Sequence, residues 1–159
     1  MAKKKKIEFT TGDVFLIPLE GGDSFGVGMV IEKTPDALNS ILCGFYDIKS
    51  TSKDELNVQE IASGKPISIQ FITPDLIEDG YWEVVGNTTP IEANEYFDFD
   101  GMKANGYIGA EVEGSAIIRK FLSAYQGVYH WNCYYKDDYF DELLLNPDIK
   151  PDRIYFIDK

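Results

Sequence analysis

The chain has 159 residues, of which 44% are hydrophobic and 14% aromatic, and its formal net charge is −12 at pH 7. This length and apolar content fit one ordinary domain with a sizeable core and exclude a wholly disordered chain. A negative field repels the nucleic-acid backbone and speeds encounter with a basic partner, so we expect no nucleic acid among the partners. Solubility alone would also account for the charge.

The N-terminal sequence, MAKKKK, is basic and is followed by no apolar segment. It therefore does not predict a secretory signal, and no apolar run approaches the roughly 20 residues that a membrane helix needs. Two cysteines, Cys43 and Cys133, are too few for a disulfide framework and are typical of buried thiols in a reducing compartment. We expect a flexible basic end over residues 1–7, a single domain over residues 8–159, and a cytoplasmic protein with no membrane partner.

The first half of the sequence predicts β-strands. Short apolar or alternating runs are separated by segments that carry Pro, Asp, Asn and Gly, which favour turns. One short helix is expected in NVQEIASG, where Asn57 can cap the start and Gly64 can end the helix. The expected strands are residues 13–19, 25–33, 41–48, 66–72 and 81–86.

The glycines of the first two strands raise the alternative of a phosphate-binding loop. Gly26 and Gly28 lie in FGVGMVIEK, but no third glycine follows at the dinucleotide-loop spacing, and the segment after them is β-branched. Glycines two residues apart on one face of a strand instead let the sheet bend or let another part of the chain approach closely. We therefore expect a turn over residues 20–24 and a bent sheet.

The second half is mixed. Asn105-Gly106 is a strong hairpin signal, and EGSAIIRKFLSAYQG predicts the main helix, near residues 115–126. The aromatic run of residues 128–140 predicts a strand that bends or ends at Lys136-Asp137, and residues 152–158 predict a final strand. Together these elements predict an α+β fold, predominantly antiparallel, with either a strongly bent sheet or a small barrel that is SH3-like in its N-terminal half.

Catalytic and metal-binding patterns are weak. His130 is the sole histidine and has no cysteine pair near it, so zinc is not indicated. The run YFDFDG, with Asp98, Asp100 and Gly101, resembles a fragment of a calcium loop, but tyrosines stand where its first and last ligands are required. We expect no enzyme, no cofactor and no metal.

Acids and aromatic residues are interleaved over residues 92–148, which hold eleven acids and four bases. An acidic rim around aromatic anchors suits a basic protein partner. The alternative is that the aromatic residues fill the core while the acids face water. The predicted partner-binding residues are Asp98, Asp100, Asp137, Asp138, Tyr139, Asp141 and Glu142.

Residues 9–92 resemble the Immunity protein 26 family of bacterial polymorphic toxin systems. The resemblance lies in GDVFLIPL, GFYDIKS, VQEIA and ISIQFITPDLIEDGYWEVVGN, in that order. It implies binding and neutralisation of a cognate toxin by occlusion, and many such toxins are basic nucleases. It transfers no catalytic residue, so we expect the matched part to be scaffold, with Phe15, Ile17, Phe45 and Trp82 in the core and with Asp47 and Trp82 as a possible hydrogen-bonded pair. A general small-barrel module that binds a peptide or another protein is the alternative.

Overall fold

A computed structural model describes residues 6–52, 54, 56–134 and 136–158. Residues 1–5 of the expected flexible end, and Tyr135 of the aromatic run, lie outside the described residues.

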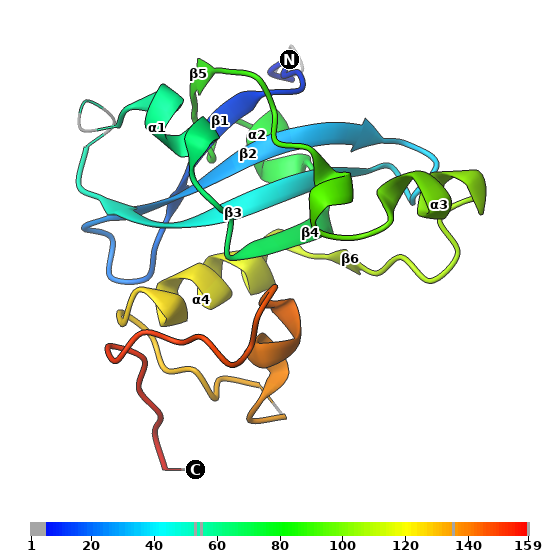
Figure 1. Cartoon of the computed structure of the whole chain (residues 1–159). Helices are drawn as coiled ribbons and strands as arrows, with labels where there is room; N and C mark the ends of the chain where they lie inside the picture. Colours follow the sequence, from blue (N-terminus) through cyan, green and yellow to red (C-terminus); the bar gives the residue numbers. More distant parts are fainter. Residues whose placement is uncertain (1–5, 53, 55, 135, 159) are drawn as a thin grey trace, which may run out of the picture.

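The centre of the structure is a six-stranded sheet with the spatial order β5-β1-β2-β3-β4-β6 (Figure 1). Neighbouring strands are antiparallel, except that β4 and β6 are parallel. Because β5 and β6 are the two edges, the described strands form an open sheet, and of the two predicted forms the barrel is not adopted. The α+β class with a mainly antiparallel sheet is confirmed. The strands are β1 (Asp13–Pro18), β2 (Phe25–Thr34), β3 (Ser40–Ser50), β4 (Ser68–Ile72), β5 (Val84–Asn87) and β6 (Val112–Glu113).

The helices are short, apart from α4, and among the described residues none is long and apolar enough to cross a membrane. The predicted helix after Asn57 is confirmed, since the Asn57 side chain accepts hydrogen bonds from the backbone N–H groups of Gln59 and Glu60. The main helix near residues 115–126 is confirmed as α4. The helices are α1 (Val58–Ser63), α2 (Asp75–Glu78), α3 (Phe99–Ala104) and α4 (Ser115–Tyr125), with the 3-10 helices η2 (Ala93–Glu95) and η3 (Tyr139–Leu143).

Both faces of the sheet are covered. On one face Phe15 and Ile17 of β1 belong to a cluster that includes residues of α4 and of the chain after it; on the other face Val14 and Leu16 pack with Ile61 of α1. This alternation follows from the period of two along a strand, and it explains why β1 is apolar at nearly every position. Figure 1 shows α4 and the C-terminal segment forming one layer, below the sheet in this view, and α1 lying on the opposite side. The expected core residues Phe15, Ile17, Phe45 and Trp82 are all buried.

The structure shows why residue 28, in the second strand, is a glycine. Gly28 pairs in register with Phe15, and a Cβ atom at Gly28 would lie 2.6 Å from Cζ of the Phe15 ring. The Phe15 ring lies across the glycine and stacks on Trp82, with 5.7 Å between ring centroids and 6° between planes. The close approach is therefore the role of this glycine, as expected for a sheet corner.

Asp47 and Trp82 do not form a hydrogen bond with each other, and each contacts other residues. Asp47 accepts a hydrogen bond from Nε2 of Gln126 over 2.9 Å and forms an ion pair with Arg153, whereas the Trp82 ring stacks on Phe15. The suggestion of a hydrogen-bonded pair was wrong, because the layer of α4 brings its own polar groups to this face of β3. Asp47 thus fastens the end of α4 and the C-terminal segment to the sheet.

The predicted hairpin at Asn105-Gly106 is wrong. The Asp98 carboxylate accepts from the backbone N–H of Gly101 over 3.0 Å and caps α3, and Asn105 is the residue at which α3 ends. Gly106 then turns the chain with φ of +69°. Both residue types favour turns, and here the turn follows a helix instead of joining two strands.

The two predicted strands at residues 128–140 and 152–158 are also wrong. Trp131 and Phe140 are buried in the cluster around α4, so their apolar character reflects packing against a helix. The segment near Trp131 runs beside the C-terminal segment, but the bonds between the described residues of the two segments are one backbone bond, from the Trp131 N–H to the Tyr155 carbonyl, and two bonds between the Asn132 side chain and the backbone of Ile157. A β-ladder does not form.

Candidate functional site

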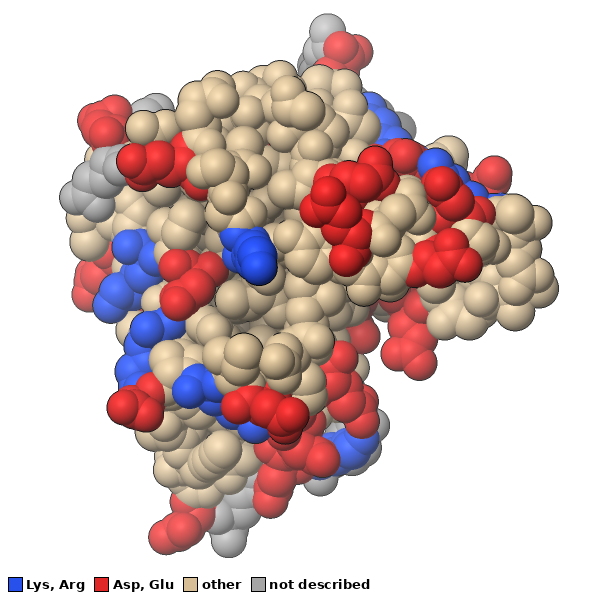
Figure 2. Space-filling model, viewed as in Figure 1, with Lys and Arg blue, Asp and Glu red and all other residues tan. Residues whose placement is uncertain are grey.

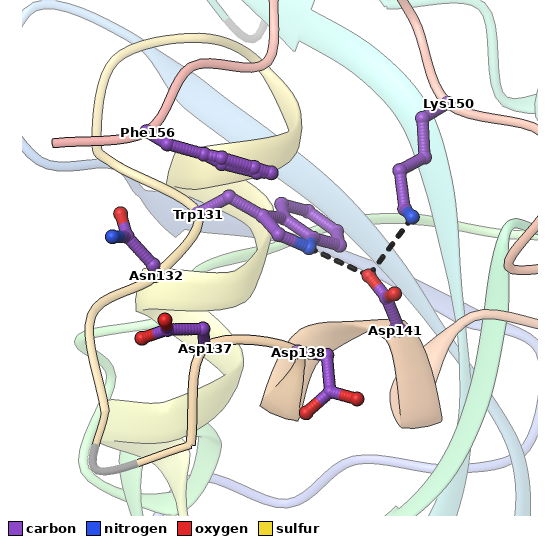
Figure 3. Close-up of a pocket in the computed structure, with 7 residues that line it drawn as sticks. All are labelled: Trp131, Asn132, Asp137, Asp138, Asp141, Lys150 and Phe156. Carbon is purple, nitrogen blue, oxygen red and sulfur yellow. Dashed lines mark hydrogen bonds and ion pairs between the residues drawn. The ribbon is translucent and has the colours of Figure 1, made fainter.

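A cavity of about 350 Å³ lies where the chain after α4, η3 and the C-terminal segment meet (Figure 3). Its wall combines aromatic rings, three carboxylates and one amine. The lining residues are Trp131, Asn132, Asp137, Asp138, Asp141, Lys150 and Phe156.

Trp131 forms the inner wall of this cavity. It is buried and packs against Phe121, Tyr125 and Phe140, with ring centroids 5.3 to 6.4 Å apart. Its indole N–H donates to Oδ1 of Asp141 over 2.7 Å, which satisfies a polar group that would otherwise be costly to bury.

Asp141 also binds Lys150. The Lys150 Nζ atom lies 3.1 Å from the same carboxylate oxygen that accepts from the indole. Figure 3 shows Lys150 reaching toward Asp141 from the side opposite Asp137 and Asp138. The charge of Asp141 is therefore balanced within the molecule, and its role at the cavity is to hold Trp131 and the C-terminal segment in place.

The outer wall is the C-terminal segment. The backbone N–H of Trp131 donates to the Tyr155 carbonyl over 2.8 Å, and the Asn132 side chain bonds both the carbonyl and the N–H of Ile157 over 2.7 and 3.0 Å. These bonds hold Phe156 beside Trp131 while its side chain stays 55% exposed. An apolar ring is thus presented to solvent at the mouth of the cavity.

Asp137 and Asp138 complete the mouth and are both exposed. In Figure 3 they lie on the other side of Trp131 from the Phe156 ring. Carboxylates near aromatic rings suit a lysine ammonium or an arginine guanidinium. Such a cation gains charge-assisted hydrogen bonds from the carboxylates and cation–π attraction from the rings. The cavity can therefore accept a cationic side chain of a partner.

The structure divides six of the seven predicted binding residues among three places, and the seventh, Tyr139, packs against Tyr134 and Phe140. Asp137, Asp138 and Asp141 line the cavity, Glu142 lines a neighbouring groove, and Asp98 and Asp100 lie at the start of α3. Whether these residues bind a partner stays a prediction.

Tyr139 and its neighbours show whether the aromatic residues of this segment fill the core or lie on the surface. Phe140 is fully buried, whereas Tyr139 is half-buried between Tyr134 and Phe140 and donates its hydroxyl to Oε2 of Glu113 over 3.3 Å. Phe140 therefore belongs to the core, and Tyr139 makes contacts inside the molecule. The exposed part of this segment is acidic.

Glu113 is a buried carboxyl beneath this segment. Burial raises its pKa, the hydrogen bond from Tyr139 opposes the shift, and the nearby charges of Glu111 and Glu142 add to it. A buried carboxyl group of β6 thus lies beneath the acidic residues of η3.

Sequence reasoning missed four residues of the cavity, namely Trp131, Asn132, Lys150 and Phe156. The last of these lies in RIYFID, a run of apolar and aromatic residues that follows Asp152 and ends in Asp158, and this composition was the available signal. The run predicts a strand, and a strand prediction does not indicate that Phe156 shares a cavity with Asp137 and Asp138.

Charge is unevenly spread over the surface. Figure 2 shows Asp and Glu side chains gathered over α3 and again around the C-terminal layer, while Lys and Arg side chains collect along the opposite edge in this view. Among the described residues, no group of three His, Cys, Asp or Glu side chains is arranged to hold a metal ion.

Comparison with known proteins finds one family. The model of the family described as Immunity protein 26 matches residues 10–105, which is more than half of the chain. No curated protein and no solved structure matches. The matched segment holds β1 to β5 and the helices α1, α2 and α3, so the cavity around Trp131 lies outside it.

Proposed function

The chain belongs to the Immunity protein 26 family, and from that premise we propose that it binds one cognate toxin domain and neutralises it by occlusion. The family supports a role as an immunity protein in a toxin system, and such proteins are generally not enzymes. The matched sheet is then the scaffold, and the part that recognises the toxin lies where this chain extends beyond the match.

The cavity around Trp131 is the observation on which we choose the toxin-binding surface. Exposed Asp137 and Asp138 and the exposed ring of Phe156 line the cavity from opposite sides of the buried Trp131 ring. A partner that offers a lysine or arginine there gains attraction to the carboxylates and to the rings at once. We therefore propose a basic toxin domain as the partner, and a nuclease is one class that fits because its own substrate is an anion.

The net charge of −12 supports the same partner. It favours fast encounter with a cationic surface and disfavours nucleic acid as a ligand of this chain. We further propose that the protein acts in the cytoplasm, where Cys43 and Cys133 would stay reduced. The alternative of a small-barrel peptide-binding module loses its structural support, because the sheet is open.

The test uses the C-terminal domain of the large secreted toxin expected beside this gene. Cells that express this domain should survive only when the full-length protein is co-expressed, and the purified partners should form a stable complex. Toxin activity should fall in proportion to added protein and vanish at one copy per toxin. Lasting inactivation by far less than one copy would indicate an enzyme, and absence of both binding and protection would overturn the proposal.

A further inference from the structure

A second hollow, of about 360 Å³, lies between α3, β4 and the chain after η3. Its floor is mainly apolar and comes from the sheet and from α3. The lining residues are Leu42, Ile69, Gln70, Phe71, Phe97, Met102, Gly109, Ala110, Glu111, Glu142 and Leu143 to Leu145. We refer to this hollow as the α3 groove.

The short pairing of β4 with β6 opens the α3 groove. The two strands pair only at Phe71 with Val112 and at Ile72 with Glu113, so residues 109–111 are not paired with the preceding part of β4. On the far side, Leu143 is fixed because its carbonyl accepts from the Gln70 and Ser68 side chains over 3.0 and 2.5 Å. The groove is therefore bounded by two segments that are each attached to β4.

Exposed apolar side chains lie at and beside the groove. Leu145 lines it and is 39% exposed, and Ile108, next to the lining residue Gly109, is 73% exposed. The loop that carries Ile108 is strained at Tyr107, whose φ is +62°. The Tyr107 ring packs edge-on against Phe71, with centroids 6.0 Å apart, and this inward contact turns the next side chain outward. Backbone strain that presents an apolar side chain to water suggests a contact made with a partner.

The rim of the α3 groove is acidic. Glu111 and Glu142 are exposed lining residues, and α3 begins with Asp98 and Asp100 on its other side. Figure 2 shows acidic side chains both over α3 and over the C-terminal layer, the two parts that border the hollow. Two nearby bases are engaged within the molecule, since Lys103 pairs with Glu32 and Lys136 with Glu142. An occupant of this groove must therefore be basic as well as apolar.

We propose that the α3 groove is a second contact with the toxin and takes a segment in which a lysine or arginine lies next to an aliphatic or aromatic side chain. The apolar side chain enters beside Ile108 and Leu145, and the cation lies against Glu111, because Glu142 on the opposite wall is already paired with Lys136. This inference rests on the proposed function, and it joins the family-matched sheet to the C-terminal layer in one interface. It also gives Asp98 and Asp100 a place at the edge of that interface.

The experiment measures binding of the neighbouring toxin domain to the full-length protein by surface kinetics. The groove variant combines Ile108→Ser with Glu111→Lys, and the matched control combines Ile7→Ser with Glu8→Lys at the other end of the described chain, where the same residue types are also exposed. We expect the groove variant to dissociate at least about tenfold faster and the control to behave as wild type. Leu145→Ser alone should show the same direction of change.

Hydrogen exchange of the wild-type complex provides a readout that requires no variant. Amides of residues 105–111 and 142–146 should become protected when the toxin domain binds. If wild type binds and neutralises the toxin while the groove variant is unaffected and these amides stay unprotected, the groove inference is overturned and the proposed function stands. If wild type does not bind at all, both fail. If the protein alone forms a dimer that Ile108→Ser disrupts, the groove is an interface between copies of this chain, and the inference is overturned.

Discussion

The indole N–H of Trp131 donates to Oδ1 of Asp141 over 2.7 Å, and this bond connects the buried layer under the sheet to the acidic surface. Because the same oxygen also holds Lys150, one carboxylate positions the wall of the cavity and the segment that leads to Phe156. Asp141 is therefore a supporting residue, whereas Asp137 and Asp138 are exposed at the mouth of the cavity and stay predicted partner contacts.

Replacing Asp141 should destabilise the fold. Asp141→Ala leaves the buried indole N–H without an acceptor and Lys150 without its partner, so the free energy of unfolding should fall by about 2 kcal/mol. Urea denaturation, followed by the fluorescence of Trp82 and Trp131, measures this change. Asp138→Ala, at an exposed position, is the control and should change stability little; equal stability of the two variants would contradict the role of Asp141.

Reversing the charges at the mouth of the cavity should slow association with the toxin domain. In the variant Asp137→Lys with Asp138→Lys, the local field that steers a basic partner changes sign, so the association rate should fall and depend less on salt. The control, Asp23→Lys with Asp54→Lys, makes the same change in net charge at two exposed positions elsewhere. If both variants slow association equally, total charge matters and the cavity does not.

Removing the exposed ring at the cavity should act on dissociation. Phe156→Ala deletes one face for a bound cation, and we expect about tenfold weaker binding through a higher dissociation rate. The ring is 55% exposed, so thermal stability should change little. Tyr81→Ala, at a ring that is 67% exposed and outside the cavity, is the matched control. An unchanged dissociation rate for Phe156→Ala would remove the cavity from the interface.

Adding one methyl group at Gly28 should strain the core. Gly28→Ala places Cβ 2.6 Å from the Phe15 ring, which is itself stacked on Trp82 and cannot move freely, so stability should fall by about 1–3 kcal/mol. Gly64→Ala is the control, because its nearest neighbours lie at an ordinary 3.5 Å and its φ is negative. Chemical denaturation compares the two variants. Equal midpoints would mean that the sheet relaxes around the methyl group at no cost.

Neutralising Glu113 should change how stability depends on pH. Burial raises the pKa of Glu113 in the folded protein above its unfolded value, so its contribution to stability is fully present below the unfolded pKa, about 4.3, and is lost as pH rises through the folded pKa. Glu113→Gln should therefore be more stable than wild type at neutral pH, with the difference closing near pH 4. Denaturation midpoints across this range test it, with exposed Glu95→Gln as control. A constant difference at all pH values would contradict the assignment.

Much of the first half could be predicted from local sequence. Strand positions followed from apolar alternation and from turn residues between the runs, and the start of α1 followed from Asn57 as a cap. These features depend on residues within a few positions of one another. The order of the strands, with β1 inside the sheet between β5 and β2, depends on long-range pairing and was not predicted.

The second half shows where local signals are ambiguous. Asn105-Gly106 favours a turn both between two strands and between a helix and a loop. Here Asp98 caps α3, so the turn follows a helix. The run from Val128 to Phe140 is rich in residues that favour strands, but α4 supplied a better partner for its rings than a strand did. Propensity was overridden by packing.

The sequence by itself determined the composition of the candidate surface, which is acidic and aromatic, and the family to which residues 10–105 belong. Only the tertiary structure decided which of these residues meet. Trp131 finds Asp141 ten positions away and Tyr155 still further along, and Glu142 faces the α3 groove while Asp137 and Asp138 face the cavity. Such contacts form when the chain folds back beneath α4 to bury its rings, and no local periodicity records them, because they arise from hydrophobic burial between segments distant in the chain.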